Sequence, residues 1–266
     1  MMDFSVVIAV YNGAKTLRAT LESLRQQTFK NFEIILVDDE SSDNSAEVIE
    51  KFSQEYPQIC IQTIRQKNKG LGGARNTGMR LSKGQFIALL DQDDIWASNK
   101  LERVLHVYRN HPQVSFVTHS LVRKVNGKIG EVLKCDFMER ETFQKLLFRG
   151  NYFCGSAMSF KKEVISQIGY FSEDRNLFHL SEDYDYWLRA AARGLKFYIL
   201  DEILGEYVVH TTNFSGNRSL MYQKEWNVVR KHYRERPVRH WSDPMHITKR
   251  LCKILARKAL VNLHLV

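Results

Sequence analysis

The first 90 residues alternate between short apolar runs and segments in which apolar residues recur every three or four positions. The apolar runs span Ser5–Val10, Phe32–Val37, Ile59–Ile64 and Gln85–Leu90. The segments between them have helical spacing, as Leu17, Leu21 and Leu24 illustrate. This alternation predicts an α/β fold with a mostly parallel central sheet, right-handed crossovers and helices on both faces.

Acidic residues follow two of these predicted strands. Asp39 lies just after the second strand, and Asp91, Asp93 and Asp94 follow the fourth. Ligands of open α/β sheets bind at the carboxyl ends of the strands, where these acids are expected to gather. Three crowded carboxylates repel one another, which favours a bound cation, and oxygen ligands suit Mg²⁺ or Mn²⁺. The alternative is an ordinary Asp-rich turn that caps a helix beginning near Ser98.

A glycine-rich loop, Asn68–Asn76, precedes the helix before the fourth strand. Its sequence, Asn-Lys-Gly-Leu-Gly-Gly-Ala-Arg-Asn, lacks the Gly-x-Gly-x-x-Gly spacing of dinucleotide folds and the Gly-Lys-Ser/Thr of a P-loop. The loop alone therefore indicates either a ligand-binding turn or a simple connection.

The regular alternation ends after Trp96. Residues 120–180 are expected to form a mixed region that shapes the pocket of a second substrate. Asn126-Gly127 predicts the turn of a hairpin. The remaining predictions are a hairpin over Leu121–Leu133, strands over Lys196–Leu200 and Ile203–Val209, and helices over Arg140–Phe148, Met221–Arg234 and Ile247–Leu263.

A further helix is predicted over Ser181–Gly194, and its first turn contains Glu182 and Asp183. These acids could serve chemistry or simply complement the helix dipole. Trp187, four residues after Asp183, shares a helix face with it. His210, at the end of the last predicted strand, is either a structural histidine or a metal ligand.

The net charge of +9 comes entirely from the C-terminal segment, because residues 218–266 contain 12 basic and 3 acidic residues. In the predicted helix over Ile247–Leu263, Lys249, Lys253 and Arg257 alternate with leucine and isoleucine. This pattern is typical of a helix that packs on its domain with a solvated basic face, or of one that lies on an anionic membrane. A basic tail could also bind nucleic acid.

Four scattered cysteines without a Cys-x-x-Cys pair argue against a zinc site or a disulfide scaffold and indicate a reducing compartment. Neither a signal peptide nor a membrane-spanning helix is expected, because no apolar segment is long enough.

Four separated motifs occur in a fixed order: Val-Val-Ile-Ala-Val-Tyr-Asn, Val-Asp-Asp-Glu-Ser, the glycine-rich loop with Leu-Asp-Gln-Asp-Asp, and Glu-Asp-Tyr-Asp-Tyr-Trp-Leu-Arg. Together they resemble the family-2 glycosyltransferases, which are inverting enzymes of the GT-A fold, in the type that builds bacterial surface polysaccharides. The resemblance spans Ser5 to Ser215. The chain departs from the family at Ala9, where proline is usual, and it lacks the Gln-x-x-Arg-Trp motif of processive synthases.

On the donor side, the resemblance implies that Tyr11 and Asp39 hold the base of a nucleotide, with uracil as the expected base. Asp91 would contact the ribose. Arg75, in the Ala-Arg-Asn stretch, would orient the carboxylates or meet the diphosphate.

For the metal and the acceptor, the resemblance implies that Asp93 binds Mn²⁺ or Mg²⁺ and that His210 approaches the metal or the diphosphate. Asp183 corresponds to the general base. Glu182 and Trp187 would shape the acceptor side. Inverting transfer independently requires one such base, and the leaving diphosphate requires a cation.

The resulting hypothesis is a metal-dependent inverting glycosyltransferase that moves one sugar from a nucleotide-sugar, expected to be a UDP-sugar, to a glycan or lipid-linked acceptor. Residues 1–217 would form the GT-A domain, with a nucleotide-binding half (1–95) and an acceptor-binding half (96–217), and residues 218–266 a basic helical extension. The expected location is the cytoplasm or the inner face of the cytoplasmic membrane, without a nucleic-acid partner. The alternatives are a catalytically inactive binding module and a sugar nucleotidyltransferase, and dTDP or GDP donors stay open.

Overall fold

The computed structural model describes residues 2–135, 142–210, 218–236 and 243–262. The strands are β1 (Phe4–Val10), β2 (Phe32–Asp38), β3 (Ile61–Arg65), β4 (Phe86–Leu89), β5 (Ile95–Trp96), β6 (Phe116–Val125), β7 (Lys128–Leu133), β8 (Ser159–Lys161) and β9 (Phe197–Val209). The helices are α1 (Leu17–Arg25), α2 (Ser45–Glu55), α3 (Gly70–Leu81), α4 (Lys100–Asn110), α5 (Thr142–Arg149), the 3₁₀ turn η1 (Gly155–Ala157), α6 (Val164–Ile168), α7 (Arg175–Phe178), α8 (Glu182–Ala192), α9 (Arg218–Glu235) and α10 (Asp243–Asn262).

All the strands described belong to one mixed sheet, in the order β3-β2-β1-β4-β8-β6-β9-β5, with β7 paired to β6. The strands from β3 to β4 are parallel, as the strand and helix alternation predicts. β8 lies antiparallel between β4 and β6, and β9 is parallel to β6. The hairpin between β6 and β7 turns at Asn126 and Gly127, which both have positive φ, so that prediction is confirmed.

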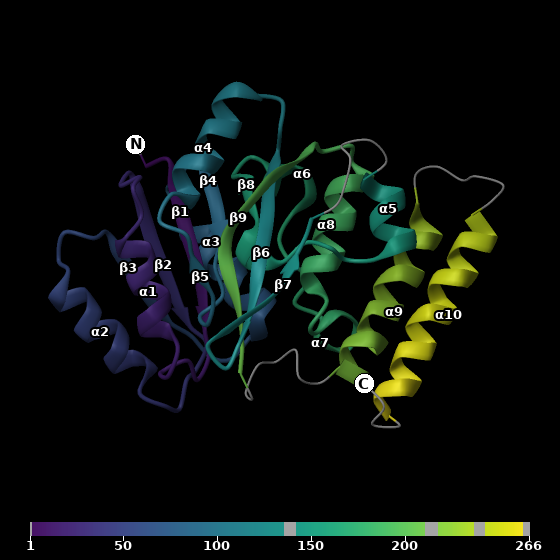
Figure 1. The fold of residues 1–266 in the computed structure, drawn as a ribbon, viewed down its shortest axis with the longest axis horizontal. Coiled ribbons are helices and arrows are strands. Elements are labelled where there is room, and N and C mark those ends of the chain that lie inside the picture. Colours follow the sequence, from purple (N-terminus) through teal and green to yellow (C-terminus); the bar gives the residue numbers. More distant parts are fainter. Residues whose placement is uncertain (1, 136–141, 211–217, 237–242, 263–266) are drawn as a thin grey trace.

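β1, β2 and β4 are buried on both faces because their alternate side chains enter apolar cores on the two sides of the sheet, whereas the edge strand β3 is only partly buried. Ile8 of β1 packs in the same core as Leu21 of α1, whereas Val7 packs with Met79 of α3 on the other face. Figure 1 shows α1 and α2 at one end of the sheet and α8, α9 and α10 at the other.

β9 is a single strand, although the sequence predicts two strands separated by Asp201 and Glu202. In the pairing with β6, Leu200 lies opposite His119 and Ile203 lies opposite Ser120. The two acidic residues are therefore accommodated in a β-bulge, which lets one strand continue through a polar interruption.

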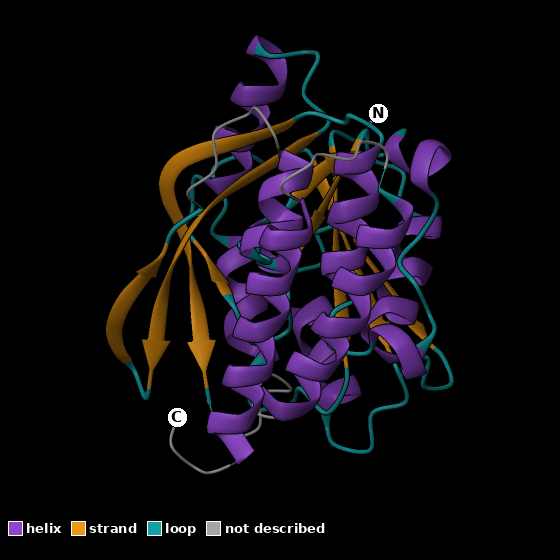
Figure 2. Ribbon diagram, turned by 90° about the vertical axis from the view of Figure 1, so that its right-hand side faces the viewer, coloured by secondary structure: helices purple, strands orange, loops and turns teal. Residues whose placement is uncertain are grey.

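The C-terminal helices form part of the apolar core that contains Val7 and Met79, which we call the second core. Val228 of α9 and Ile254 of α10 are buried in the cluster that contains Trp187. α9 and α10 pack against each other and against α5 or α8, and Figure 2 shows them as a layer facing the viewer. The predicted helices over Met221–Arg234 and Ile247–Leu263 are therefore confirmed within the described residues, which exclude Leu263 and the predicted domain boundary after residue 217. Across the described ranges, no helix combines the length and apolar character needed to cross a membrane.

Candidate active site

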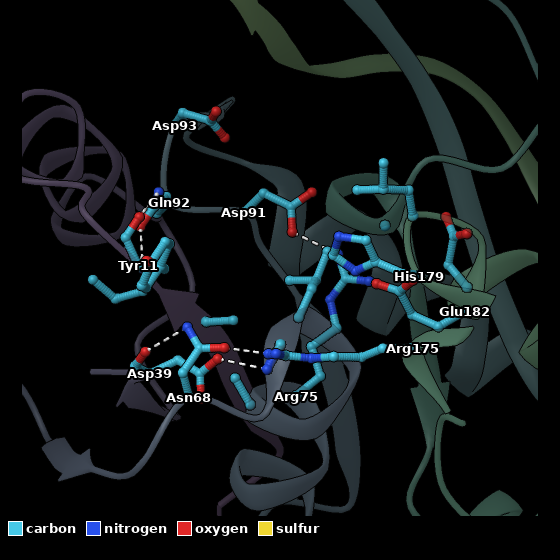
Figure 3. A pocket seen from close by; sticks show the side chains of 18 of the residues that line it. Tyr11, Asp39, Asn68, Arg75, Asp91, Gln92, Asp93, Arg175, His179 and Glu182 are labelled. Carbon is cyan, nitrogen blue, oxygen red and sulfur yellow. Dashed lines mark hydrogen bonds and ion pairs between the residues drawn. The ribbon is translucent and has the colours of Figure 1, made fainter. Parts of the chain in front are cut away.

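A cavity of about 470 Å³ opens at the carboxyl edge of the parallel strands. Tyr11 follows β1, Asp39 follows β2 and Asp91 follows β4, and all three line this cavity. Their approach is a consequence of the parallel register of β1 with both β2 and β4, which brings the strand ends to one edge. Figure 3 shows these side chains around the cavity, with Asp93 on one side and Glu182 on the other.

Asp39 holds the first turn of α3. Its carboxylate accepts hydrogen bonds from the Lys69 and Gly70 backbone N–H groups at 2.8 and 2.7 Å, and from Gln66 Nε2 at 2.7 Å. The residue is 3% exposed, yet it lines the cavity. A carboxylate can accept about four hydrogen bonds, so Asp39 retains capacity for one from a ligand.

Tyr11 is fixed by Gln92, a residue that the sequence motifs did not single out. The Tyr11 backbone N–H donates to Gln92 Oε1 at 2.9 Å, and Gln92 Nε2 donates to the Tyr11 carbonyl at 3.0 Å. A Cβ on Gly13 would lie 2.3 Å from Gln92 Oε1, so only glycine leaves room for this amide. These two hydrogen bonds connect the loop after β1 to the loop after β4 that contains Asp91, Asp93 and Asp94, here called the acidic loop.

Arg75 of α3 pairs with Asp91 at 2.6 Å and is 3% exposed. Burial opposes its charge, but the carboxylates of Asp91, Glu182 and Asp183 raise the pKa of Arg75. Gly155 makes room for this guanidinium, because a Cβ there would lie 2.6 Å from Arg75 Nη2. Arg75 therefore orients Asp91 and places one positive charge among several acids.

The sequence predicts that Asp91, Asp93 and Asp94 gather around one cation, but the structure does not place the Asp94 side chain with the other two. This side chain turns into the protein, where it accepts from Ser156 Oγ at 2.5 Å and from the Val208 backbone N–H at 2.9 Å. Burial raises the pKa of Asp94, and the charges of Asp91 and Asp93 raise it further. Asp94 thus connects β9 to the acidic loop. Of the three aspartates in that loop, Asp91 and Asp93 line the cavity and Asp94 does not.

Asp93 lies next to His210, the last described residue before the gap at residues 211–217. Their Oδ2 and Nε2 atoms are 2.9 Å apart. Burial and the nearby Asp91 raise the pKa of Asp93, which His210 opposes. Within the described ranges, no three His, Cys, Asp or Glu side chains are arranged to hold a metal ion.

Glu182 and Asp183, in the first turn of α8, also line the cavity. Glu182 lies on the side of the cavity away from Asp93 (Figure 3). Asn151 Nδ2 donates to Asp183 Oδ2 at 3.4 Å. Burial, with a smaller effect of the Glu182 charge, raises the pKa of Asp183 to about 7, and Arg75 opposes this shift. Glu182 is 5% exposed, and its Oε2 atom has no hydrogen-bond partner among the described residues.

Trp187 does not occupy the acceptor-side position expected from the motif. It is fully buried in the second core, with its ring 5.8 Å from that of Phe116 and 6.0 Å from that of Phe171. One turn beyond Asp183, α8 already lies against the aromatic side chains of the sheet. Trp187 therefore stabilises the helix that carries the two acids and does not line the cavity.

Several further residues line the cavity, although none of them was assigned a role from the sequence. They are Gln92, Asn68, Cys154, Arg175, His179, Tyr207 and Met221. Asn68 and Gln92 lie inside recognised motifs, so their positions could have been inferred. The others come from elements whose contact with the nucleotide-binding half depends on the complete fold.

A family model described as Glycosyl transferase family 2 matches residues 5–169. The chain therefore belongs to glycosyltransferase family 2, and its relatives include enzymes of the surface-polysaccharide type that the motifs predicted. It is 29% identical over 229 residues to WfaP of Escherichia coli, a match covering 85% of each chain. WfaP is named as a UDP-Glc:alpha-D-GlcNAc-diphosphoundecaprenol beta-1,3-glucosyltransferase.

Two solved structures show the same fold. TarS of S. aureus, in complex with UDP-GlcNAc, has a TM-score of 0.71 at 20% identity, covering 96% of this chain and 72% of TarS residues 1–349. The mannosyltransferase PcManGT of Pyrobaculum calidifontis, in complex with GDP-Man and Mn²⁺, has a TM-score of 0.69 at 18% identity, covering 96% and 74%. The predicted GT-A fold is confirmed.

Proposed function

We propose that this glycosyltransferase moves a single sugar from a UDP-sugar to a hydroxyl of a glycan or lipid-linked acceptor, with inversion and with a bound Mn²⁺ or Mg²⁺. The observation that carries the proposal is Asp183, a half-buried carboxylate with a pKa raised to about 7 in the cavity that Tyr11, Asp39 and Asp91 also line. A general base works best when its pKa lies near the working pH.

Asp183 accepts the proton of the acceptor hydroxyl as its oxygen attacks the anomeric carbon. Inversion requires in-line attack from the face opposite the leaving diphosphate. Figure 3 shows Glu182, the neighbour of Asp183 in α8, on the side of the cavity away from Asp93, and Asp183 lines the same cavity. Asn151 holds one Asp183 oxygen from the outer side. Glu182, with an unpartnered buried oxygen, is placed to accept a hydrogen bond from a sugar hydroxyl.

The residues that would bind the nucleotide-sugar donor lie at the carboxyl ends of β1, β2 and β4. The Tyr11 ring, 37% exposed, offers a face for stacking a base, and Asp39 accepts the imide N–H of uracil. Asp91, held by Arg75, accepts from the ribose hydroxyls. The UDP-Glc donor in the name of WfaP and the UDP-GlcNAc bound to TarS support uridine as the nucleoside.

Asp93 and His210 fit a divalent metal. A carboxylate oxygen and an imidazole nitrogen converge to 2.9 Å, and the raised pKa of the buried Asp93 marks a negative charge that a cation would stabilise. Mg²⁺ is commonly bound through one or two carboxylates together with substrate phosphates. The metal, when bound, would neutralise the charge that develops on the leaving diphosphate. The Mn²⁺ present in the PcManGT complex supports this proposal.

Calorimetric titration tests the donor and metal assignments together. We expect UDP to bind the parent in Mn²⁺ and to bind at least about tenfold more weakly after removal of the metal, or in Asp93→Ala, because each change removes one charge-assisted contact. dTDP, GDP and CDP should bind more weakly than UDP. Equal UDP affinity in the parent with Mn²⁺, the parent with EDTA and Asp93→Ala would contradict the metal assignment.

We further propose that α10 places the enzyme on an anionic membrane surface, where a lipid-linked acceptor would be found. Its outer face carries exposed Lys249, Lys253 and Arg257, together with Met245 (65% exposed) and Leu260 (41% exposed). The charge of Arg257, with smaller effects of burial and of other cations, lowers the pKa of Lys253, which indicates that cations are crowded on this face of α10. Ile247 and Ile254 pack inward, so the exposed face is free for lipid.

Sedimentation with vesicles tests this surface. Each lysine near an anionic membrane contributes about 1 kcal/mol, so the double variant Lys249→Glu/Lys253→Glu should bind phosphatidylglycerol vesicles at least about tenfold more weakly than the parent. A matched variant, Lys67→Glu/Lys128→Glu, changes two exposed lysines elsewhere and should bind like the parent. Equal binding by both variants would contradict a role for α10.

A further inference from the structure

The short helix α7 forms a wall of the cavity and is held by the C-terminal helix α9. Lys224 of α9, 9% exposed, donates through Nζ to the carbonyl oxygens of Arg175, at 3.1 Å, and of Asn176. Asn227, also on α9, donates to the Leu177 carbonyl at 3.4 Å. The backbone of α7 is therefore fixed, and the side chain of Arg175 leaves it toward the cavity.

Arg175 reaches across the cavity from α7 to the loop that precedes α3 (Figure 3). Its Nη2 atom donates to Asn68 Oδ1. A Cβ on Gly70 would lie 2.8 Å from both Nε and Nη2 of Arg175, so the guanidinium lies directly over this glycine. Gly70 also has a φ of +77°, which disfavours any other residue there.

The guanidinium of Arg175 has more N–H donors than the described residues use. It forms no ion pair with a carboxylate of the described chain, and Asn68 is its one hydrogen-bond acceptor there. A guanidinium carries five N–H donors in a fixed plane. Arg75, by contrast, is already paired with Asp91.

The position of Arg175 relative to Asp39 indicates which chemical group of a ligand Arg175 would bind. The same Asn68 that accepts from Arg175 donates through Nδ2 to the Asp39 carbonyl at 3.0 Å. The same Gly70 that lies under the guanidinium donates its backbone N–H to Asp39 Oδ2. A strong hydrogen-bond donor and a strong acceptor thus lie beside each other in the cavity.

We propose that Arg175 selects the base of the donor by donating to the ring carbonyl next to the N–H that Asp39 accepts. This inference rests on the proposed function, in which Asp39 binds the imide of uracil. Uracil presents that N–H between two carbonyl oxygens, which matches an acceptor flanked by a donor. In the same orientation, with Arg175 facing position 4 of the ring, cytosine presents an unprotonated nitrogen to Asp39 and an amine to Arg175, so neither of these hydrogen bonds can form.

The test compares UDP with CDP by calorimetry on the full chain in Mn²⁺. Arg175→Ala should weaken UDP binding about tenfold or more, as expected for one hydrogen bond from a charged group, and should change CDP binding less than about twofold. The preference for UDP over CDP should therefore fall about tenfold. Asn176→Ala, an exposed residue of the same helix that does not line the cavity, should leave both affinities unchanged.

Equal losses for UDP and CDP would assign Arg175 to the ribose or diphosphate and overturn the base-selection role. Unchanged or tighter UDP binding in Arg175→Ala would also overturn it. Failure of the parent to bind any nucleotide would instead refute the proposed function, and the inference with it.

Discussion

Asp183→Asn is expected to slow sugar transfer by about 10² to 10⁴, the usual worth of a general base. The amide has nearly the same size as the carboxylate but cannot accept the proton of the acceptor hydroxyl. UDP affinity should stay within about threefold of the parent, because Asp183 lies at the acceptor side and the loss should fall on kcat. The measurement is the steady-state release of UDP, with UDP affinity determined on the same preparations.

The pH profile gives this prediction a second readout. Because the pKa of Asp183 is raised to about 7, the carboxylate is protonated and inactive below that pH. The rate of the parent should rise with pH up to about 7 and then level off, and the residual rate of Asp183→Asn should lack this rise. Asp183→Glu, which keeps a carboxylate, should retain the rise at a lower rate. Full activity in Asp183→Asn would refute the assignment.

Asp185→Asn is expected to destabilise the protein by about 3 kcal/mol, the usual cost of breaking a buried ion pair by removing one of its partners. Asp185 is 1% exposed and joins α8 to α9. It accepts from Arg189 Nε at 2.8 Å, lies 2.9 Å from His232 Nε2, and accepts from Lys231 Nζ at 3.1 Å. For a chain of this size, Tm should fall by about 6 to 12 °C in a thermal melt.

The dependence of this contribution on pH follows from the direction of the pKa shift. Burial opposes the charge of Asp185, but the hydrogen bond from His232 and the charge of Arg189 lower its pKa overall. The stabilisation is therefore present above the unfolded pKa of about 4 and is lost as the pH falls further, toward the folded pKa. Asp201→Asn, at an exposed position without a hydrogen bond among the described residues, should melt like the parent. An unchanged Tm in Asp185→Asn would show that the polar contacts of Asp185 contribute little to stability.

The sequence predicts the fold of residues 1–95 well because its signals are local. Each parallel strand is an apolar run that ends at a polar residue, so Tyr11, Asp39 and Asp91 could be placed at one edge before the structure was known. The contact of Glu182 and Asp183 with the same cavity followed from the combination of motifs and not from spacing alone.

Other features depend on contacts between distant segments, which a local pattern does not encode. Asp94 directly follows Asp93 in the sequence, but hydrogen bonds with Ser156 and Val208 hold its side chain inside the protein. Trp187 is positioned by aromatic partners on other elements. Arg175 reaches Asn68 over 107 positions of sequence, and nothing near it in the chain marks it as a cavity residue.

The most direct test of the central claim is the anomeric configuration of the sugar released from UDP-Glc, UDP-GlcNAc or UDP-Gal. These donors carry α-linked sugars, and water can replace the acceptor in a slow hydrolysis that Asp183 also assists. Proton NMR of the parent in Mn²⁺, recorded before mutarotation, should show the β-sugar first, with release reduced in both Asp183→Asn and Asp93→Ala. First release of the α-sugar would contradict inversion, and release that is unchanged in both variants would contradict the assigned site.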